Sequence, residues 1–456
     1  MKLTRTLAAG LGLGLAAGLV APLGMAHAAP AAGRATAGTP QPAAGATQPV
    51  PGRAGEITVR GVATESATAA AAADPTATGG RRTVPRAAEL QAALDQMVAD
   101  EGAISTIARV EHGRATWRGT AGPARLGRPG PAPVNGRFRI GSVTKTFVAT
   151  VVLQLVAEGR LRLNDPVQRR LPGMVPNGDR ITLRHLLSHT SGLYNYSDAL
   201  PTDIDGFIRN RMRTWTPAEL VAIATAQPPL FEPGARWSYS NTNYILLGLV
   251  VERVTGRPYS AEVQRRILRP LGLRHTSLPG SFPRILGPHA RSYVPTPEGP
   301  VDITLLNPTV GYAAGEMIST TADLNRFTAA LLGGRLLPPA QLAEMTRSVP
   351  DADYGLGMQM ITTSCGVTVY GHTGGLGTYG TFAFATRDGR KRLANSVVLW
   401  TGDFLPGLVA LLNAAFCPAG TTPAYAGGPA PKVLVDHPAS PRLVGTAGTR
   451  VGGGAA

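Results

Sequence analysis

The stretch that decides the fold is residues 138–159, which read FRIGSVTKTFVATVVLQLVAEG. The nearly continuous apolar run at 147–156 predicts a buried helix. Gly141 leads into this helix and Gly159 ends it, so Ser142 is expected at the helix N-terminus. Free backbone amides and the helix dipole favour developing negative charge at that point. The position of Ser142 therefore suits a nucleophile.

Lys145 follows Ser142 by three residues, and residues at i and i+3 share one face of a helix. The Lys145 amine is therefore expected to reach the Ser142 hydroxyl. Arginine could not serve as the base, because a guanidinium keeps its proton whereas a desolvated lysine can be neutral at about pH 7. The Ser-x-x-Lys spacing alone also fits a serine cap with a surface lysine. The apolar helix that follows is what favours a catalytic pair.

A second polar element, Tyr239-Ser240-Asn241, precedes another apolar helical run at 245–254. Side chains two apart on an extended loop point the same way, so Tyr239 and Asn241 are expected to face the site together. The phenol can relay a proton, and the amide can hydrogen-bond a substrate amide. Capping of the following helix by Asn241 or Thr242 is the alternative.

A third element, His372-Thr373-Gly374-Gly375, ends a predicted strand. Gly374 and Gly375 allow a ligand to approach the backbone, and a strand-edge amide there can donate into an oxyanion hole. A single histidine beside a glycine turn is usually structural. The three elements occur in order on an expected helix, loop and strand, and that order favours a catalytic site.

The two ends of the folded region predict one shared sheet. Apolar spacing and alternation predict a helix at 87–99, five strands at 104–110, 115–119, 366–370, 379–386 and 393–401, and a last helix at 406–417. We therefore expect an α+β fold with an antiparallel five-stranded sheet, flanking helices and an inserted, mainly helical lobe at about 143–345. A cleft between sheet and lobe would hold the site.

Residues 1–28 resemble a secretory signal peptide, with a basic start, an apolar stretch and the small-residue site Ala26-His27-Ala28. Residues 29–82 are rich in Ala, Pro and Gly and predict a disordered linker or propeptide, and residues 420–456 a disordered tail. The folded domain is expected at 83–419. A membrane anchor at the N-terminus is the alternative, but glycines interrupt the apolar stretch, so we expect a secreted protein without a stable anchor.

The formal net charge is +16, and the arginines that supply most of it are scattered. No basic block suits nucleic acid, so no nucleic-acid partner is expected. A basic exported protein would be drawn to an anionic cell wall. The charge therefore concerns location rather than chemistry.

The chain has two cysteines, Cys365 and Cys417. An exported chain meets oxidising conditions, so we expect them to form a disulfide. Two separate buried thiols are the alternative, and neither cysteine has the close partner spacing of a zinc site.

Other hydrolase classes fit the sequence less well. His185 and His189 are four apart, as zinc ligands on a helix can be, but Leu186 occupies the position of the glutamate in a His-Glu-x-x-His site. A Ser-His-Asp hydrolase would show Gly-x-Ser-x-Gly, which is absent from the sequence. A non-catalytic cell-wall binding protein is a further alternative, against which the intact Ser142 and Lys145 argue.

The three elements resemble those of the serine penicillin-recognising enzymes, in the branch that joins secreted D-alanyl-D-alanine carboxypeptidases with class C β-lactamases and related esterases. The resemblance covers about residues 83–417. It extends to three further segments: Leu186-Leu187-Ser188-His189-Thr190-Ser191-Gly192-Leu193, Tyr354-Gly355-Leu356-Gly357 and Ser364-Cys365-Gly366. It is greatest with carboxypeptidases whose third motif begins with histidine and which carry a cysteine pair in these places.

The resemblance implies a role for each site residue. Ser142 would be the nucleophile, Lys145 and Tyr239 would move protons, Asn241 would orient the substrate amide, and His372 would support the proton network. Backbone amides of Ser142 and Gly375 would form the oxyanion hole. A monomer without metal or organic cofactor is expected, acting on a small peptide, ester or β-lactam, with cell-wall peptidoglycan as a further candidate partner.

The resemblance also shows a departure in substrate binding. In those carboxypeptidases an arginine, and a threonine just after His-Thr-Gly, hold the terminal carboxylate of the substrate. These positions fall on Gln359 and Gly375 here. We therefore expect intact acylation chemistry with a weakened preference for free C-terminal carboxylates, because charge-assisted hydrogen bonds are about twice as strong as neutral ones.

Overall fold

The computed structural model describes residues 84–201, 203–350 and 352–421. The predicted signal peptide at 1–28, the predicted linker at 29–82 and most of the predicted tail at 420–456 lie outside these residues. Their boundaries therefore stay predictions. Within the described part of the chain, no helix combines the length and the hydropathy that crossing a lipid bilayer requires.

An antiparallel sheet of six strands, ordered β2-β1-β10-β9-β8-β7, is the framework of the described residues. Its strands are β1 (Ala103–His112), β2 (Ala115–Ala121), β7 (Gln359–Thr362), β8 (Thr368–Leu376), β9 (Tyr379–Thr386) and β10 (Lys391–Leu399). All five expected strands are present, but the predicted number was wrong because β7 adds a sixth at one edge. β7 has only four residues, three of them buried, so it shows no alternation that would reveal a strand in the sequence.

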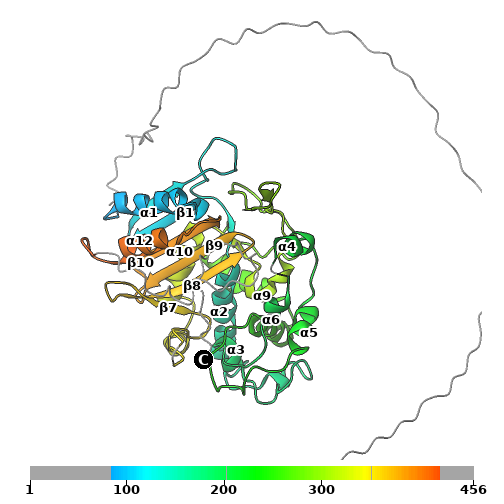
Figure 1. The fold of residues 1–456 in the computed structure, drawn as a ribbon. Coiled ribbons are helices and arrows are strands. Elements are labelled where there is room, and N and C mark those ends of the chain that lie inside the picture. The colour runs from blue at the N-terminus through cyan, green and yellow to red at the C-terminus, as the bar shows by residue number, and fades with distance from the viewer. Residues whose placement is uncertain (1–83, 202, 351, 422–456) are drawn as a thin grey trace, which may run out of the picture. The chain divides into compact units, whose positions relative to one another are not determined.

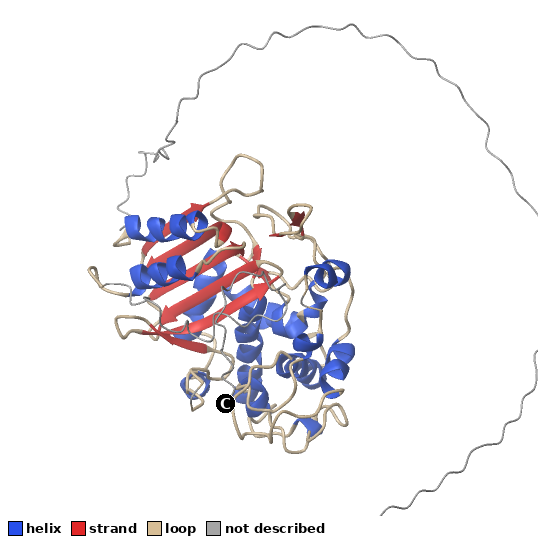
Figure 2. Ribbon diagram, viewed as in Figure 1, coloured by secondary structure: helices blue, strands red, loops and turns tan. Residues whose placement is uncertain are grey.

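Helices cover both faces of this sheet (Figures 1 and 2). On one face, α1 (Ala87–Ala99) and α12 (Leu405–Phe416) pack against each other and against the strands. On the other face lies α10 (Thr321–Leu332). Within β9, Phe384 belongs to the core under α1 and α12, whereas its neighbours in sequence, alanines 383 and 385, belong to the core on the opposite face.

Most residues between β2 and β7 form the helical lobe expected at about 143–345, whose central helix is α2 (Thr144–Ala157). α10 was expected in this lobe but packs on the sheet instead. Eleven of its fourteen residues are buried, as expected for a helix that is apolar on nearly all sides. Around it lie α3 (Leu183–Leu187), α4 (Ile204–Asn210), α5 (Pro217–Thr225), α6 (Thr242–Thr255), α7 (Tyr259–Val263), α8 (Arg269–Leu271), α9 (Tyr312–Gly315) and α11 (Pro339–Met345). Two small antiparallel pairs complete the lobe: β3 (Phe138–Arg139) with β6 (Ile318–Ser319), and β4 (Tyr293–Val294) with β5 (Val301–Asp302).

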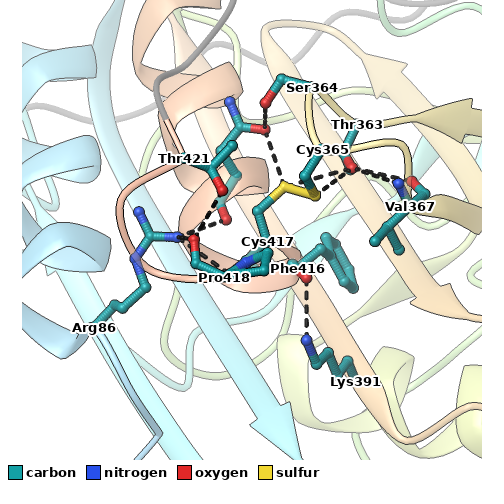
Figure 3. The surroundings of a disulfide bond; sticks show 12 residues. Arg86, Thr363, Ser364, Cys365, Val367, Lys391, Phe416, Cys417, Pro418 and Thr421 are labelled. Carbon is teal, nitrogen blue, oxygen red and sulfur yellow. Dashed lines mark hydrogen bonds between the residues drawn. A yellow bond between two sulfur atoms is a disulfide. The ribbon is translucent and has the colours of Figure 1, made fainter.

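The expected disulfide between Cys365 and Cys417 is present, with the two Cα atoms 5.8 Å apart (Figure 3). It ties the turn between β7 and β8 to the end of α12. Beside it, the Ser364 hydroxyl donates a 2.7 Å hydrogen bond to Asn413 Oδ1 on α12. The strand that carries the third sequence element is thereby fixed to the C-terminal helix.

Candidate active site

Ser142 lies in a tight turn at the start of α2. The turn is a 3-10 helix, Gly141–Val143, that runs directly into α2, as the sequence predicts. Gly141 has a φ of +48°, and a Cβ atom at this position would lie 2.3 Å from the backbone nitrogen of Gly375. Only glycine therefore lets β8 pass this close to the serine.

The Lys145 amine is fully buried and makes three polar contacts. Its Nζ atom lies 2.8 Å from Ser142 Oγ, 2.7 Å from Asn241 Oδ1 and 2.8 Å from the carbonyl oxygen of Ala314. Burial lowers the pKa of Lys145 well below its ordinary value. In a neutral amine the two N–H bonds can go to the two carbonyl oxygens. The lone pair then faces the Ser142 hydroxyl and can accept its proton.

Asn241 is the N-cap residue of α6, but its side chain does not cap the helix. Instead Oδ1 accepts from Lys145, and Nδ2 donates to Ser197 Oγ at 3.0 Å. The backbone N–H of Asn241 donates to Asn195 Oδ1 at 2.9 Å, which holds the residue in place. Asn241 therefore does not cap α6, because its side-chain amide is hydrogen-bonded to Lys145 instead.

Tyr239 contacts both Lys145 and Ser142. Lys145 Nζ is 5.0 Å from the centre of its ring, and the phenol is hydrogen-bonded to Ser142. Burial raises the pKa of Tyr239 above its ordinary value, and the hydrogen bond with Ser142 acts in the opposite direction. The phenol is therefore protonated at neutral pH and can pass a proton on.

The third element lies on β8 where this strand has an open edge. β7 pairs with β8 only as far as Gly371, so within the described residues the rest of β8 has no strand on that side. The Thr373 N–H points to this edge, because it donates to the Gln359 side chain at 2.7 Å. Amides two residues apart in a strand point the same way, so the Gly375 N–H faces the same edge beside Gly141. Gly374 needs to be a glycine, because a Cβ there would lie 2.0 Å from the carbonyl oxygen of Ile140.

His372 and Gln359 are both buried beside this edge. His372 Nδ1 lies 2.5 Å from the carbonyl oxygen of Thr373, and Nε2 lies 3.0 Å from the Tyr354 hydroxyl. Gln359 is the first residue of β7, opposite Gly371, and its Oε1 is the acceptor of the Thr373 N–H. The structure thus places Ser142, Lys145, Tyr239 and Asn241 together beside the 372–375 segment of β8 and Gln359.

The two histidines considered as zinc ligands lie in different local structures. His185 lies in α3 and takes part in the capping box with Thr182. His189 follows the helix and has a φ of +59°. Among the residues that the structure describes, no group of three or more His, Cys, Asp or Glu side chains is arranged to hold a metal ion.

Sequence reasoning missed several contacts of the site. The Ala314 carbonyl is a backbone group 169 residues from Lys145, and its residue type gives no signal. Ser197 lies outside the three elements. His189 and Tyr354 lie in two further segments of the family resemblance, so a signal for them existed, but neither residue was assigned a role in the serine hydrolase site.

Comparisons with known proteins agree with this geometry. A family model described as beta-lactamase matches residues 90–406. A D-stereospecific amidohydrolase from Streptomyces sp. has a TM-score of 0.67 and 45% identity, over 73% of this chain and 99% of that chain. A D-amino acid amidase from Ochrobactrum anthropi SV3, solved with L-phenylalanine amide, has a TM-score of 0.64 and 28% identity, over 72% of this chain and 97% of that chain.

Curated relatives match over a shorter part of their length. Esterase EstB of Burkholderia gladioli is 36% identical over 221 residues, which are 45% of this chain and 54% of that protein. The chain spans about half the length of the first curated relatives that it matches. The family model covers well over half of this chain. On these grounds the chain belongs to the beta-lactamase family and is a serine hydrolase of that family.

Proposed function

We propose that the protein hydrolyses small amides and esters of D-amino acids through an acyl-enzyme at Ser142. The proposal draws on the 45% identity to a D-stereospecific amidohydrolase whose chain is covered almost completely. Relatives that are an amidase and an esterase suggest both leaving groups. The nucleophile, base and oxyanion donors do not depend on which leaving group is present.

Acylation follows from the contacts of Lys145. The neutral amine takes the proton of Ser142, and Oγ attacks the substrate carbonyl carbon. The carbonyl oxygen becomes an oxyanion between the backbone amides of Ser142 and Gly375. Collapse of the tetrahedral intermediate breaks the bond to the amine or alcohol. That leaving group receives a proton from Tyr239, which regains one from Lys145.

Deacylation uses the same groups in the same order. A water molecule gives a proton to neutral Lys145 and attacks the acyl carbon. Collapse of the tetrahedral intermediate releases the acid, and the departing Ser142 oxygen takes the proton back from Lys145. Asn241 holds Lys145 through Oδ1 throughout. Its Nδ2 has two hydrogens, of which Ser197 takes one, so the second can bind a substrate carbonyl.

The observation that carries the substrate class is the position of Gln359. Its Oε1 is turned to the Thr373 backbone, at the place where carboxypeptidases of similar sequence have an arginine. The neutral amide of Gln359 cannot make the two charge-assisted hydrogen bonds with which an arginine binds a terminal carboxylate. Amides and esters have a neutral group at that end and do not need one. D-alanyl-D-alanine carboxypeptidase activity, with β-lactam binding, is the competing possibility within the family.

The test compares kcat/KM for matched substrates. The first pair is a D-Ala-D-Ala peptide and its C-terminally amidated form, and the second pair is D- and L-phenylalanine amide. A short acyl ester and a β-lactam complete the panel, with Ser142→Ala as the inactive control. We expect preference for the D-amide and no preference for the free acid. A large preference for the free-acid peptide would refute the amidase assignment and support the carboxypeptidase.

Covalent labelling separates any hydrolase from a cell-wall binding protein. A fluorophosphonate should label the protein at Ser142 and leave Ser142→Ala unlabelled. Absence of label on well-folded protein would favour the binding protein. We also propose export: mass spectrometry of protein secreted by the native host should find a new N-terminus after Ala28, and a retained Met1 would contradict it.

A further inference from the structure

Two motifs have no role in the chemistry described so far, and their side chains meet. His189 follows α3, and Tyr354 precedes β7. Both are fully buried. His189 Nε2 lies 3.2 Å from the Tyr354 hydroxyl oxygen, which in turn lies 3.0 Å from His372 Nε2. A continuous hydrogen-bonded chain therefore runs from the helical lobe to β8.

The partners of His189 fix where its proton lies. The backbone N–H of Ser240 and the side-chain Nδ2 of Asn243 both lie near His189 Nδ1, at 3.2 and 3.1 Å. Asn243 is held in this orientation, because Ser191 Oγ donates to its Oδ1 at 2.6 Å. Both neighbours of Nδ1 can only donate, so Nδ1 accepts and the ring proton is on Nε2. Burial lowers the pKa of His189 well below its ordinary value and favours this neutral ring.

The partners of His372 determine which of its ring nitrogens carries the proton. The carbonyl oxygen of Thr373 can only accept, so His372 Nδ1 carries a proton and donates to it. In the neutral ring Nε2 is then an acceptor. Tyr354 donates its hydroxyl proton to His372 Nε2 and accepts the Nε2–H of His189. Each of the two hydrogen bonds therefore has one donor and one acceptor, and both donate in the direction from His189 through Tyr354 to His372.

His189 also contacts the loop that carries Tyr239 and Asn241. Its ring centre lies 4.2 Å from the Tyr239 ring centre, with the planes tilted by 33°. Its Nδ1 accepts from the backbone of the next residue, Ser240. His189 is therefore bonded on one side to the loop that carries the phenol and on the other, through Tyr354, to the strand that carries the oxyanion amide.

We propose that His189 and Tyr354 are positioning residues that hold His372 neutral with its proton on Nδ1 and fix the Tyr239 loop against β8. Neither residue touches the reacting atoms. Their effect is to set the spacing between the proton relay and the oxyanion amide, which flank Ser142. The inference rests on the proposed acyl-enzyme at Ser142 but not on the identity of its substrate.

The kinetic test removes one hydroxyl. Tyr354→Phe should lower kcat for a short ester by about tenfold to a hundredfold with little change in KM, because it leaves a buried donor and a buried acceptor unpaired next to the site. The matched control is Tyr379→Phe, which removes another buried hydroxyl, bonded to the Ala290 carbonyl at 2.6 Å. This control should lower the Tm and leave kcat unchanged. His189→Gln, which keeps a side-chain N–H, should retain more activity than His189→Ala.

A substrate-free test reads the protons directly. Nitrogen-15 NMR of the histidine rings in the full chain should show His372 as the Nδ1–H form and His189 as the Nε2–H form, and Tyr354→Phe should shift the His372 signals. A proton on His372 Nε2 in the wild type, or wild-type kcat in Tyr354→Phe, would overturn the inference. If the wild-type protein is inactive on every ester and amide, the proposed function is contradicted. The NMR result would still test the positioning role of His189 and Tyr354.

Discussion

Restoring the missing charge at Gln359 is the sharpest test of the substrate class. In Gln359→Arg a guanidinium replaces the buried amide at the start of β7. A charge-assisted hydrogen bond to a substrate carboxylate contributes about 1.5–3 kcal/mol. The loss of the bond from the Thr373 N–H costs about 1 kcal/mol, but it affects both substrates and cancels in their ratio. The ratio of kcat/KM for a free-acid peptide to that for its amide should therefore rise by about tenfold to a hundredfold.

Gln359→Met is the matched control for this substitution. It removes the same bond to Thr373 without adding a charge, so it should lower kcat/KM for both peptides and leave their ratio unchanged. The assay is steady-state hydrolysis of the two peptides by folded protein, with the Tm measured beside it. A ratio in Gln359→Arg equal to that in Gln359→Met would refute the reasoning that the absent charge sets the substrate class.

Four further predictions test the site and the fold. Lys145→Arg should lower kcat for an ester by about a thousandfold, because arginine cannot act as a base, and near-normal steady-state rates would contradict that role. Because neutral Lys145 is the reactive form, kcat/KM should rise as the pH passes its lowered pKa and be fully developed well below pH 10.5, the ordinary lysine value; a rise only near that value would show an ordinary amine. The double substitution Cys365→Ser with Cys417→Ser should lower the free energy of unfolding by about 4 kcal/mol, the chain-entropy value for a separation of 52 residues, and an unchanged urea midpoint would show that the disulfide does not stabilise the fold. Gly141→Ala should abolish fluorophosphonate labelling with a native circular dichroism spectrum, since its Cβ would meet the Gly375 backbone; normal labelling would show that β8 can move away.

The sequence predicts local features of the fold well. The helix at 87–99 and the strands of the sheet have clear periodicity, and the structure has them with small shifts at their ends. β7 was missed because a short strand buried on both faces has no alternating pattern. β8 continues through Gly375, beyond its expected end, since glycines read as a turn although here they let the strand pass against the serine turn.

In the candidate site, too, contacts between residues close in sequence could be predicted, whereas contacts between distant segments could not. Ser142 and Lys145 are three residues apart in continuous helical backbone, so their contact could be predicted from this spacing together with the apolar helix that follows. Assigning Asn241 to the site needed the family resemblance, because its local sequence also fits a helix cap. Its contact with Lys145 was not predicted and is seen only in the structure. The Ala314 carbonyl and the chain through Tyr354 depend on contacts between distant segments, which residue types and spacing do not encode.

The pairing of β1 with β10 in the middle of the sheet has a consequence for how the chain matures. Thr106 pairs with Val397, so β1, the first strand to be synthesised, cannot form its hydrogen bonds with β10 until nearly the whole domain has been made. Such long-range pairing is slow and leaves an exposed strand edge in the meantime. Ser142 likewise precedes its β8 neighbour Gly375 by most of the domain. A nascent chain that ends before β8 lacks the Gly375 amide beside the serine turn. Under the proposed mechanism, we therefore expect hydrolysis only from chains whose synthesis has passed β8.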